Sequence, residues 1–189
     1  MGTRGVTGVI IDGIEKIGYQ QFDSYPSGVG IITLNALKKN DISKLKELAK
    51  SLKAVQENAT PTKKEIELLK NYADLTVSDG KLENWYCLLR KTQGDLKAIL
   101  DCGYIIDSKD FLNNSLFCEW GYIVNFDTNK LEIYQGFQKQ KHDKGRYSNN
   151  LKEDDLAYYP CALIKEYDLK SLPTKKKFLS DLEDTSEYY

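Results

Sequence analysis

The chain has 189 residues, of which 41% are hydrophobic and 29% are charged. This length predicts one domain, and the apolar content excludes an intrinsically disordered protein. The 27 basic residues are balanced by 28 acidic residues, which gives a net charge of −1. Such a chain has no overall positive field for a nucleic-acid backbone or an anionic membrane, so we do not expect nucleic acid as a partner.

Arginine is scarce in this chain, because Arg4, Arg90 and Arg146 stand beside 24 lysines. A guanidinium group binds a carboxylate or a phosphate in a forked geometry that the lysine ammonium cannot match. Each arginine is therefore a candidate for a specific contact rather than for general surface charge.

No segment has the run of apolar residues that a membrane span needs, and the start of the chain lacks the apolar core of a signal peptide. We therefore expect a cytoplasmic protein with no membrane partner. Cys87, Cys102, Cys118 and Cys161 show no C-x-x-C spacing, and the chain has one histidine. We expect buried, reduced thiols, with neither a metal site nor a cofactor.

The first residues predict a β-hairpin. Residues 3–11 are rich in β-branched side chains, an Asp-Gly pair follows, and residues 14–21 give the return strand. A turn-rich loop over residues 22–30 leads into a first helix over residues 31–37. The loop therefore ends at the N-terminus of a helix.

The spacing of apolar residues becomes helical over residues 41–103. This segment contains one apolar stripe, one capping box and two further helices. In chain order these are Leu45, Leu48, Ala49 and Leu52; Thr62 with Glu65; and residues 83–91 and 95–101, ended by Gly103. We interpret the segment as a helical insertion between sheet elements.

A second block of strands follows the insertion. Side chains alternate strictly from Leu116 to Phe126, a pattern that helical spacing cannot give. The remaining elements are a turn at 127–130, a return strand at 131–137, a polar loop at 138–155, a fifth strand at 158–165, a helix at 174–182 and a tail at 183–189.

These elements predict an α+β fold with a mostly antiparallel sheet, built from two β-hairpin blocks with a helical insertion between them. We expect a single domain over residues 1–189. In it, residues 1–40 and 104–170 form the sheet core, and residues 41–103 form the insertion.

The most unusual segment is residues 23–30, named here the glycine loop. Pro26 fixes one backbone angle, whereas glycine permits conformations that other residues resist. Ahead of a helix N-terminus, such a loop can aim backbone N–H groups at an anion. The candidate ligand-binding residues are Asp23, Ser24, Tyr25, Ser27, Gly28 and Gly30. The spacing matches no phosphate-binding motif, and a strand-to-helix turn capped by Asp23 explains the same residues.

Three basic residues complete the candidate site. Arg4 is placed to pair with Asp23 or with a ligand phosphate, and the sequence leaves both open. Lys144 and Arg146 lie in the most basic stretch, residues 139–150. That stretch is either a lid over an anionic ligand or a solvated surface loop.

The M-G-T-R-G start, the Asp-Gly turn and the D-S-Y-P-S-G-V-G run of the glycine loop resemble a widespread group of uncharacterised proteins from phages, bacteria and fungi. Residues 119–127 and 131–137 also resemble the second block of that group. The likeness does not extend to the helical insertion. It implies a small phage-borne protein in the host cytoplasm that acts on host machinery or on nucleotide signals of host defence.

A second likeness concerns Thr3. Gly2 followed by Thr3 at the start of a hairpin is similar to the junction at which N-terminal-nucleophile hydrolases cut themselves to expose a catalytic threonine. Removal of Met1 alone would leave Gly2 at the N-terminus, so a further cut is required. Lys16 is the residue in the first strands that would have to act as the helper.

Our leading hypothesis is a non-catalytic protein that binds a small phosphorylated or nucleotide-type ligand, with sequestration of a nucleotide signal in phage counter-defence as its role. Arg4, the glycine loop and residues 139–150 would form the site. One alternative is an inhibitor that blocks a host protein through an aromatic surface, for which 13 tyrosines supply side chains. The other is the threonine hydrolase. Each of these three candidate functions is compatible with an oligomeric protein.

Overall fold

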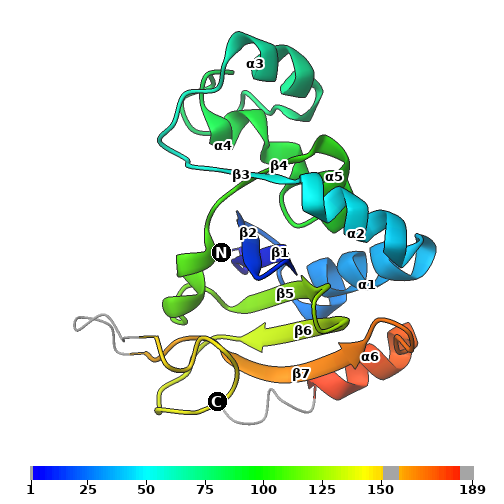
Figure 1. The fold of residues 1–189 in the computed structure, drawn as a ribbon. Coiled ribbons are helices and arrows are strands. Elements are labelled where there is room, and N and C mark those ends of the chain that lie inside the picture. Colours follow the sequence, from blue (N-terminus) through cyan, green and yellow to red (C-terminus); the bar gives the residue numbers. More distant parts are fainter. Residues whose placement is uncertain (1, 151–157, 184–189) are drawn as a thin grey trace.

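The computed structural model describes residues 2–150 and 158–183, and its sheet confirms the expected α+β class (Figure 1). Five strands lie in the spatial order β2-β1-β5-β6-β7. Their bounds are Gly5–Ile11 for β1, Ile14–Gln20 for β2, Trp120–Asn125 for β5, Lys130–Gln135 for β6 and Ala162–Asp168 for β7.

The two expected hairpins meet in the middle of this sheet. The pairs β1–β2, β5–β6 and β6–β7 are antiparallel. The strands β1 and β5 run parallel, with Gly5 opposite Trp120. A parallel pair needs a long crossover connection, and the helical segment between β2 and β5 supplies it.

The tips of the two hairpins are tied together. Asp12 and Gly13 both have positive φ, 53° and 71°, which is the geometry of a two-residue hairpin turn. The Asp127 carboxylate accepts hydrogen bonds from Asp12 N–H at 2.9 Å and from Gly13 N–H at 2.8 Å. The turn of the second hairpin therefore holds the turn of the first.

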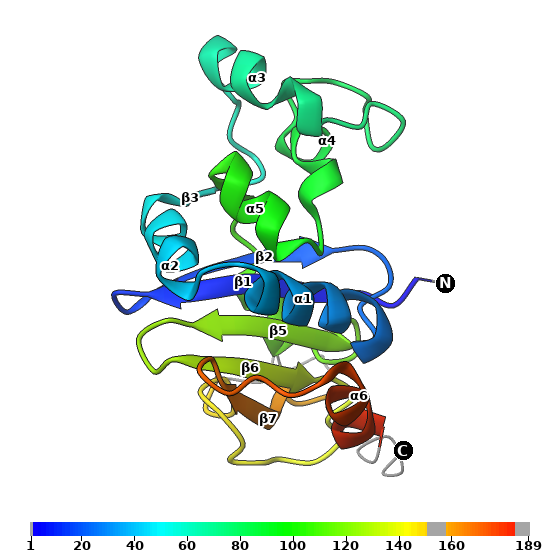
Figure 2. The ribbon, with the colours of Figure 1, turned by 90° about the vertical axis from the view of Figure 1, so that its right-hand side faces the viewer.

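Helices cover one face of the sheet (Figure 2). They are α1 (Ile31–Lys39), α2 (Ile42–Ser51), α5 (Leu96–Cys102) and α6 (Lys175–Glu183). The Asp41 side chain caps α2 by accepting from Ser43 N–H at 2.7 Å. The core on this face includes Val9, Leu34, Tyr122, Leu131 and Phe178.

Irregular segments cover the opposite face. Residues 107–118, which include a 3-10 turn at Lys109–Asn113, and residues 138–150 pack there. The buried residues of this second core include Val6, Leu112, Ile123, Tyr134 and Tyr147. All four cysteines are buried and free of disulfides.

The insertion has a small core of its own. It contains α3 (Lys63–Leu69), α4 (Trp85–Leu88), and 3-10 turns at Lys70–Tyr72 and Arg90–Thr92. Trp85 stacks on Tyr104 with ring centres 5.7 Å apart. The expected capping box at Thr62 and Glu65 is confirmed, and its hydrogen bonds lower the pKa of Glu65.

A two-stranded parallel sheet at the base of the insertion was not expected, and its second strand comes from residues 104–170, which were expected to form the sheet core. It joins β3 (Lys53–Val55) to β4 (Tyr104–Ile106). Strands of three residues are too short to show a period of two in the sequence. The sheet closes the base of the insertion next to β2.

The structure corrects three boundaries. The strand expected from Leu116 begins at Trp120, because the N–H groups of Phe117 and Cys118 donate to Asn114 O in a turn. The helix expected over 83–91 breaks into α4 and a 3-10 turn. The fifth strand begins at Ala162 rather than at 158, because Pro160 has no N–H to donate to a ladder.

Some expectations fall outside the described residues. They are the part of the polar loop at 151–155 and the tail at 184–189.

Candidate functional site

The glycine loop forms a tight turn ahead of α1, and its N–H groups are used within it. Gly28 N–H donates to Tyr25 O at 3.0 Å, and Val29 N–H donates to Asp23 O at 2.9 Å. Gly30 N–H also donates to Tyr25 O, at 3.3 Å. An anion bound here would have to replace these internal hydrogen bonds.

Close packing accounts for both glycines of the loop. A Cβ atom at Gly28 would lie 2.3 Å from Asp23 O, and one at Gly30 would lie 2.9 Å from the Tyr122 ring. The side chains of Asp23 and Ser27 are exposed. The glycines therefore allow the loop to pack on itself and on the sheet.

Ser24 is fully buried in a polar network below the loop. Its Oγ accepts from Gln20 Nε2 at 3.0 Å, and Gln20 Oε1 accepts from Thr7 Oγ1 at 2.6 Å. The Tyr122 hydroxyl donates to Ser24 O at 2.8 Å. Ser24 thus ties the loop to β1, β2 and β5.

Removing the hydroxyl of Tyr122 tests this network. Tyr122→Phe leaves the buried Ser24 carbonyl without its donor, so we expect the free energy of unfolding to fall by about 1 kcal/mol. Urea denaturation measures this. Tyr25→Phe is the matched control, since Tyr25 is 50% exposed and should change little. Equal stability of the two variants would contradict the structural role of Ser24.

Arg4 lies beside the start of the chain. Its guanidinium group stacks on Phe117, with Cζ 4.5 Å from the ring centre, and its main-chain N–H donates to Glu119 at 3.4 Å. Within residues 2–150 and 158–183, Arg4 forms no ion pair with Asp23. The pair expected between Arg4 and Asp23 is therefore not formed.

A hollow of about 630 Å³ lies next to Arg4. We call it the N-terminal hollow; its lining includes Thr3, Arg4, Gln21, Tyr25, Glu119 and Phe137. Arg4 and Tyr25, two of the expected ligand-binding residues, thus line the same hollow.

The structure separates Thr3 from its expected helper. Thr3 is 3% exposed at the wall of the hollow. The Lys16 amine instead donates to Ala49 O at 2.8 Å and Lys50 O at 3.0 Å, where it caps the C-terminal end of α2. Burial lowers the pKa of Lys16, and the charge of Asp12 opposes that shift. An intact mass beginning at Met1 or Gly2 would contradict the hydrolase alternative.

Arg146 lies on the sheet face opposite the helices. It forms ion pairs with Glu132, which is 2% exposed, and with Glu15 at 3.9 Å. Asn125 Nδ2 and the Tyr134 hydroxyl also donate to Glu132, at 2.8 and 3.0 Å. We call Asn125, Glu132, Tyr134 and Arg146 the Glu132 cluster.

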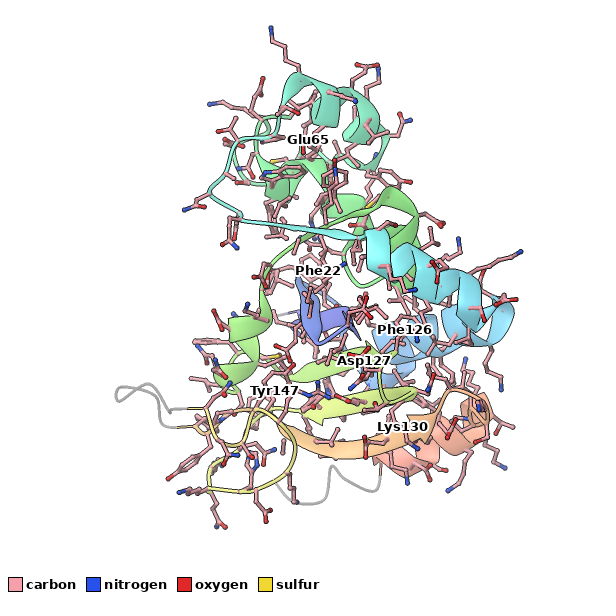
Figure 3. All side chains as sticks on the ribbon, in the orientation of Figure 1. Phe22, Glu65, Phe126, Asp127, Lys130 and Tyr147 are labelled. Carbon is pink, nitrogen blue, oxygen red and sulfur yellow. The ribbon has the colours of Figure 1, made fainter. Side chains whose placement is uncertain are left out.

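The Glu132 cluster and Lys144 do not join the glycine loop. The Lys144 side chain is exposed, and its main-chain oxygen accepts from Leu163 N–H at 3.1 Å. Figure 3 shows Tyr147 on the face opposite α1 and α2, and Phe22 between the sheet and the insertion. Residues 139–150 therefore pack along one face of the sheet and do not cover the glycine loop.

A cleft of about 290 Å³ lies between β2 and the insertion. We call it the edge cleft. Gly18 and Tyr19 of β2 form one wall, and Tyr86 and Gln93 of the insertion form the other. Its interior is lined by apolar side chains, which include Leu89, Ile99, Ile105 and Phe111. Phe111 closes one side of the cleft. The cleft is therefore largely apolar, with aromatic rings and one acidic side chain, Glu57, among its lining residues.

Arg90 stands beside the edge cleft between two aromatic rings. Its Cζ lies 5.4 Å from the centre of the Phe22 ring and 5.7 Å from that of Tyr86. Its Nη1 donates to Gln93 Oε1 at 2.5 Å. Its Nε is buried and has no acceptor among the described residues. The two rings and Gln93 therefore hold this guanidinium group in place, and its Nε–H is left without an acceptor in the described structure.

Tyr19 connects the edge cleft to the N-terminal hollow. Its ring packs edge-on against Phe111 at 5.2 Å, and its hydroxyl bonds to Gln21, which lines the hollow. Burial and the neighbouring Tyr86 raise the pKa of Tyr19, and the positive charges of Arg4 and Arg90 oppose that shift. Two of the three arginines thus lie near one tyrosine.

The edge cleft was not predicted from the sequence. Its aromatic residues come from β2, the insertion and the segment before β5, with no motif spacing between them. The signals that could have indicated it were the scarcity of arginine, which marked Arg90, and the abundance of tyrosine.

Comparison with protein-family models, curated proteins and solved structures found no match. In the described part of the chain, no helix has the length and apolar character to cross a membrane. The site must therefore be interpreted from its own chemistry.

Proposed function

We propose that the protein binds a small nucleotide-type ligand, with a flat ring in the edge cleft and an anionic group near Arg90 and Arg4. The observation that carries the proposal is the cleft itself, where tyrosine and phenylalanine rings surround an apolar interior beside a fixed guanidinium group. Stacking on aromatic rings suits any heterocycle, and arginine suits a phosphate.

The size of the cleft supports a small ligand. A volume of about 290 Å³ lies at the lower end of small-molecule sites and suits one ring system. The charged part of the ligand would extend from the cleft toward the N-terminal hollow, where Arg4 lies. Both arginine side chains are then used by one ligand.

We propose binding without conversion. Three of the hydroxyls in the cleft are already engaged: Thr92 donates to Leu89 O at 2.8 Å, Ser108 donates to Ile106 O at 3.3 Å, and Tyr19 donates to the Gln21 side chain. Sequestration of a nucleotide signal during phage counter-defence, which the resemblance implies, would follow from tight binding of this kind.

Calorimetry with ligands that carry the ring and with one that lacks it tests the proposal. We expect adenosine or uridine 5′-monophosphate to bind, and ribose 5-phosphate, which lacks the ring, to bind at least about tenfold more weakly. Tyr86→Leu should weaken nucleotide binding by about tenfold, because it removes one stacking surface.

Tyr25→Leu is the control for this experiment, because Tyr25 belongs to the glycine loop and lies outside the edge cleft. It should weaken nucleotide binding less than Tyr86→Leu does, because Tyr25 lines the N-terminal hollow and offers no stacking surface in the edge cleft. A loss of binding in Tyr25→Leu with none in Tyr86→Leu would place the ligand at the glycine loop. No binding of either nucleotide would contradict the proposed function.

An exposed aromatic surface favours the second candidate, an inhibitor of a host protein. Phe22, Tyr25 and Phe117 are 53%, 50% and 39% exposed, and Arg4 stacks on Phe117. Aromatic and arginine side chains dominate protein interfaces. A partner protein that is lost in a Phe22→Ser, Phe117→Ser double variant and kept in Tyr86→Leu would support this candidate.

A further inference from the structure

The strand β2 forms one edge of the five-stranded sheet, next to the edge cleft. It pairs with β1 in a regular register, with Ile17 opposite Gly8 and Tyr19 opposite Val6. On its outer side, Ser108 N–H donates to Ile17 O at 2.8 Å. The main-chain groups of Ile17 therefore point away from β1.

Tyr19 continues this outer edge. In an antiparallel pair, the residues that point their N–H and C=O groups outward recur at every second position. The N–H and C=O of Tyr19 thus point the same way as those of Ile17, and no other residue of the described ranges bonds to them there. Tyr19 lines the edge cleft together with Gly18, which presents only main chain.

We propose, on the basis of the proposed function, that the Tyr19 main chain recognises the ring edge of the ligand. Its N–H donates to a ring acceptor, and its C=O accepts from an adjacent N–H, which belongs to the ring in uracil and to the exocyclic amine in adenine. The ligand class is then a heterocyclic base with neighbouring donor and acceptor atoms, such as uracil or adenine. Tyr86 contacts the face of the ring, and Arg90 lies near the anionic group.

The short length of the open edge favours a small molecule over a peptide strand. Ser108 already occupies the edge at Ile17, and β2 ends at Gln20. Only one outward-facing residue, Tyr19, is left open between them in the described structure. One residue offers one donor and one acceptor, which matches the edge of a base, whereas a docked strand needs several.

Methylated nucleotides separate edge recognition from ring stacking. 3-Methyluridine 5′-monophosphate and N6,N6-dimethyladenosine 5′-monophosphate keep the ring and the phosphate but lack the donor. Calorimetry should give affinities about 10- to 100-fold weaker than for the parent nucleotides, because the Tyr19 C=O would be left without a donor.

Amide hydrogen exchange locates the contact. Addition of the parent nucleotide should slow exchange of the Tyr19 N–H, whereas the Gly18 N–H, which faces β1, should be protected with or without ligand. Tyr19→Phe keeps the main chain and should keep the discrimination against methylated nucleotides. Loss of that discrimination in Tyr19→Phe would assign recognition to the hydroxyl and overturn the inference.

The outcomes distinguish the inference from the proposed function. Equal affinity for parent and methylated nucleotides, with no change at the Tyr19 amide, would overturn edge recognition and leave ring binding in place. Failure of all the nucleotides to bind would overturn both. Protection that spreads to the Ile17 amide on addition of an extended peptide, with none from nucleotides, would identify a peptide site instead.

Discussion

Replacing Arg146 with methionine is expected to lower the free energy of unfolding by about 2–3 kcal/mol. Glu132 is 2% exposed, so its carboxylate depends on its partners for solvation. Methionine keeps much of the apolar stem of Arg146 and removes the ion pairs to Glu132 and Glu15. The expected loss lies below that of a fully buried pair, because the Arg146 side chain is 34% exposed and water can reach the gap.

Chemical denaturation measures this loss. The matched control is Lys130→Met, because Lys130 pairs with Asp168 at 3.6 Å and both side chains are over a third exposed. Exposed pairs contribute little, so the control should change stability by less than about 1 kcal/mol. Equal effects of the two variants at neutral pH would show that the Glu132 cluster does not hold residues 138–150 on the sheet.

Replacing Gly28 with alanine is also expected to cost about 2–3 kcal/mol of stability, with nucleotide affinity unchanged. The new Cβ would lie 2.3 Å from Asp23 O, which is main chain, so the turn itself must shift. The edge cleft does not include this loop, so folded protein should bind as before.

Ser27→Ala is the control for Gly28→Ala, because Ser27 is exposed in the same loop. Thermal denaturation gives the stability, and calorimetry below the melting temperature gives the affinity. A stable Gly28→Ala variant that no longer binds nucleotide would show that the glycine loop holds the ligand, as sequence analysis first suggested.

Local signals in the sequence predicted most of the fold. The Asp-Gly turn, the alternation from Trp120 onward and the capping box at Thr62 each specify a structure within a few residues. Boundaries shifted where a turn interrupted the pattern, as at Asn114, or where a residue has no N–H group to donate, as at Pro160. The parallel pairing of β1 with β5 depends on contacts between segments far apart in the chain, which no local pattern encodes.

The candidate site was harder to predict than the fold. The sequence left open whether Arg4 pairs with Asp23 or binds a ligand phosphate; in the described structure no ion pair joins Arg4 to Asp23, and Arg146 forms ion pairs with Glu132 and Glu15. The glycine loop looked like an anion site because its composition does not reveal where its N–H groups donate. The edge cleft forms only when β2 meets the insertion, so Tyr19 and Tyr86 carry no shared signal in the sequence.

The central claim is that the edge cleft is the ligand site. Its most direct test is the change in backbone amide chemical shifts when adenosine or uridine 5′-monophosphate is added to the protein. We expect the largest changes at Gly18, Tyr19, Tyr86 and Gln93. Changes confined to the glycine loop, or no changes with either nucleotide, would contradict the claim.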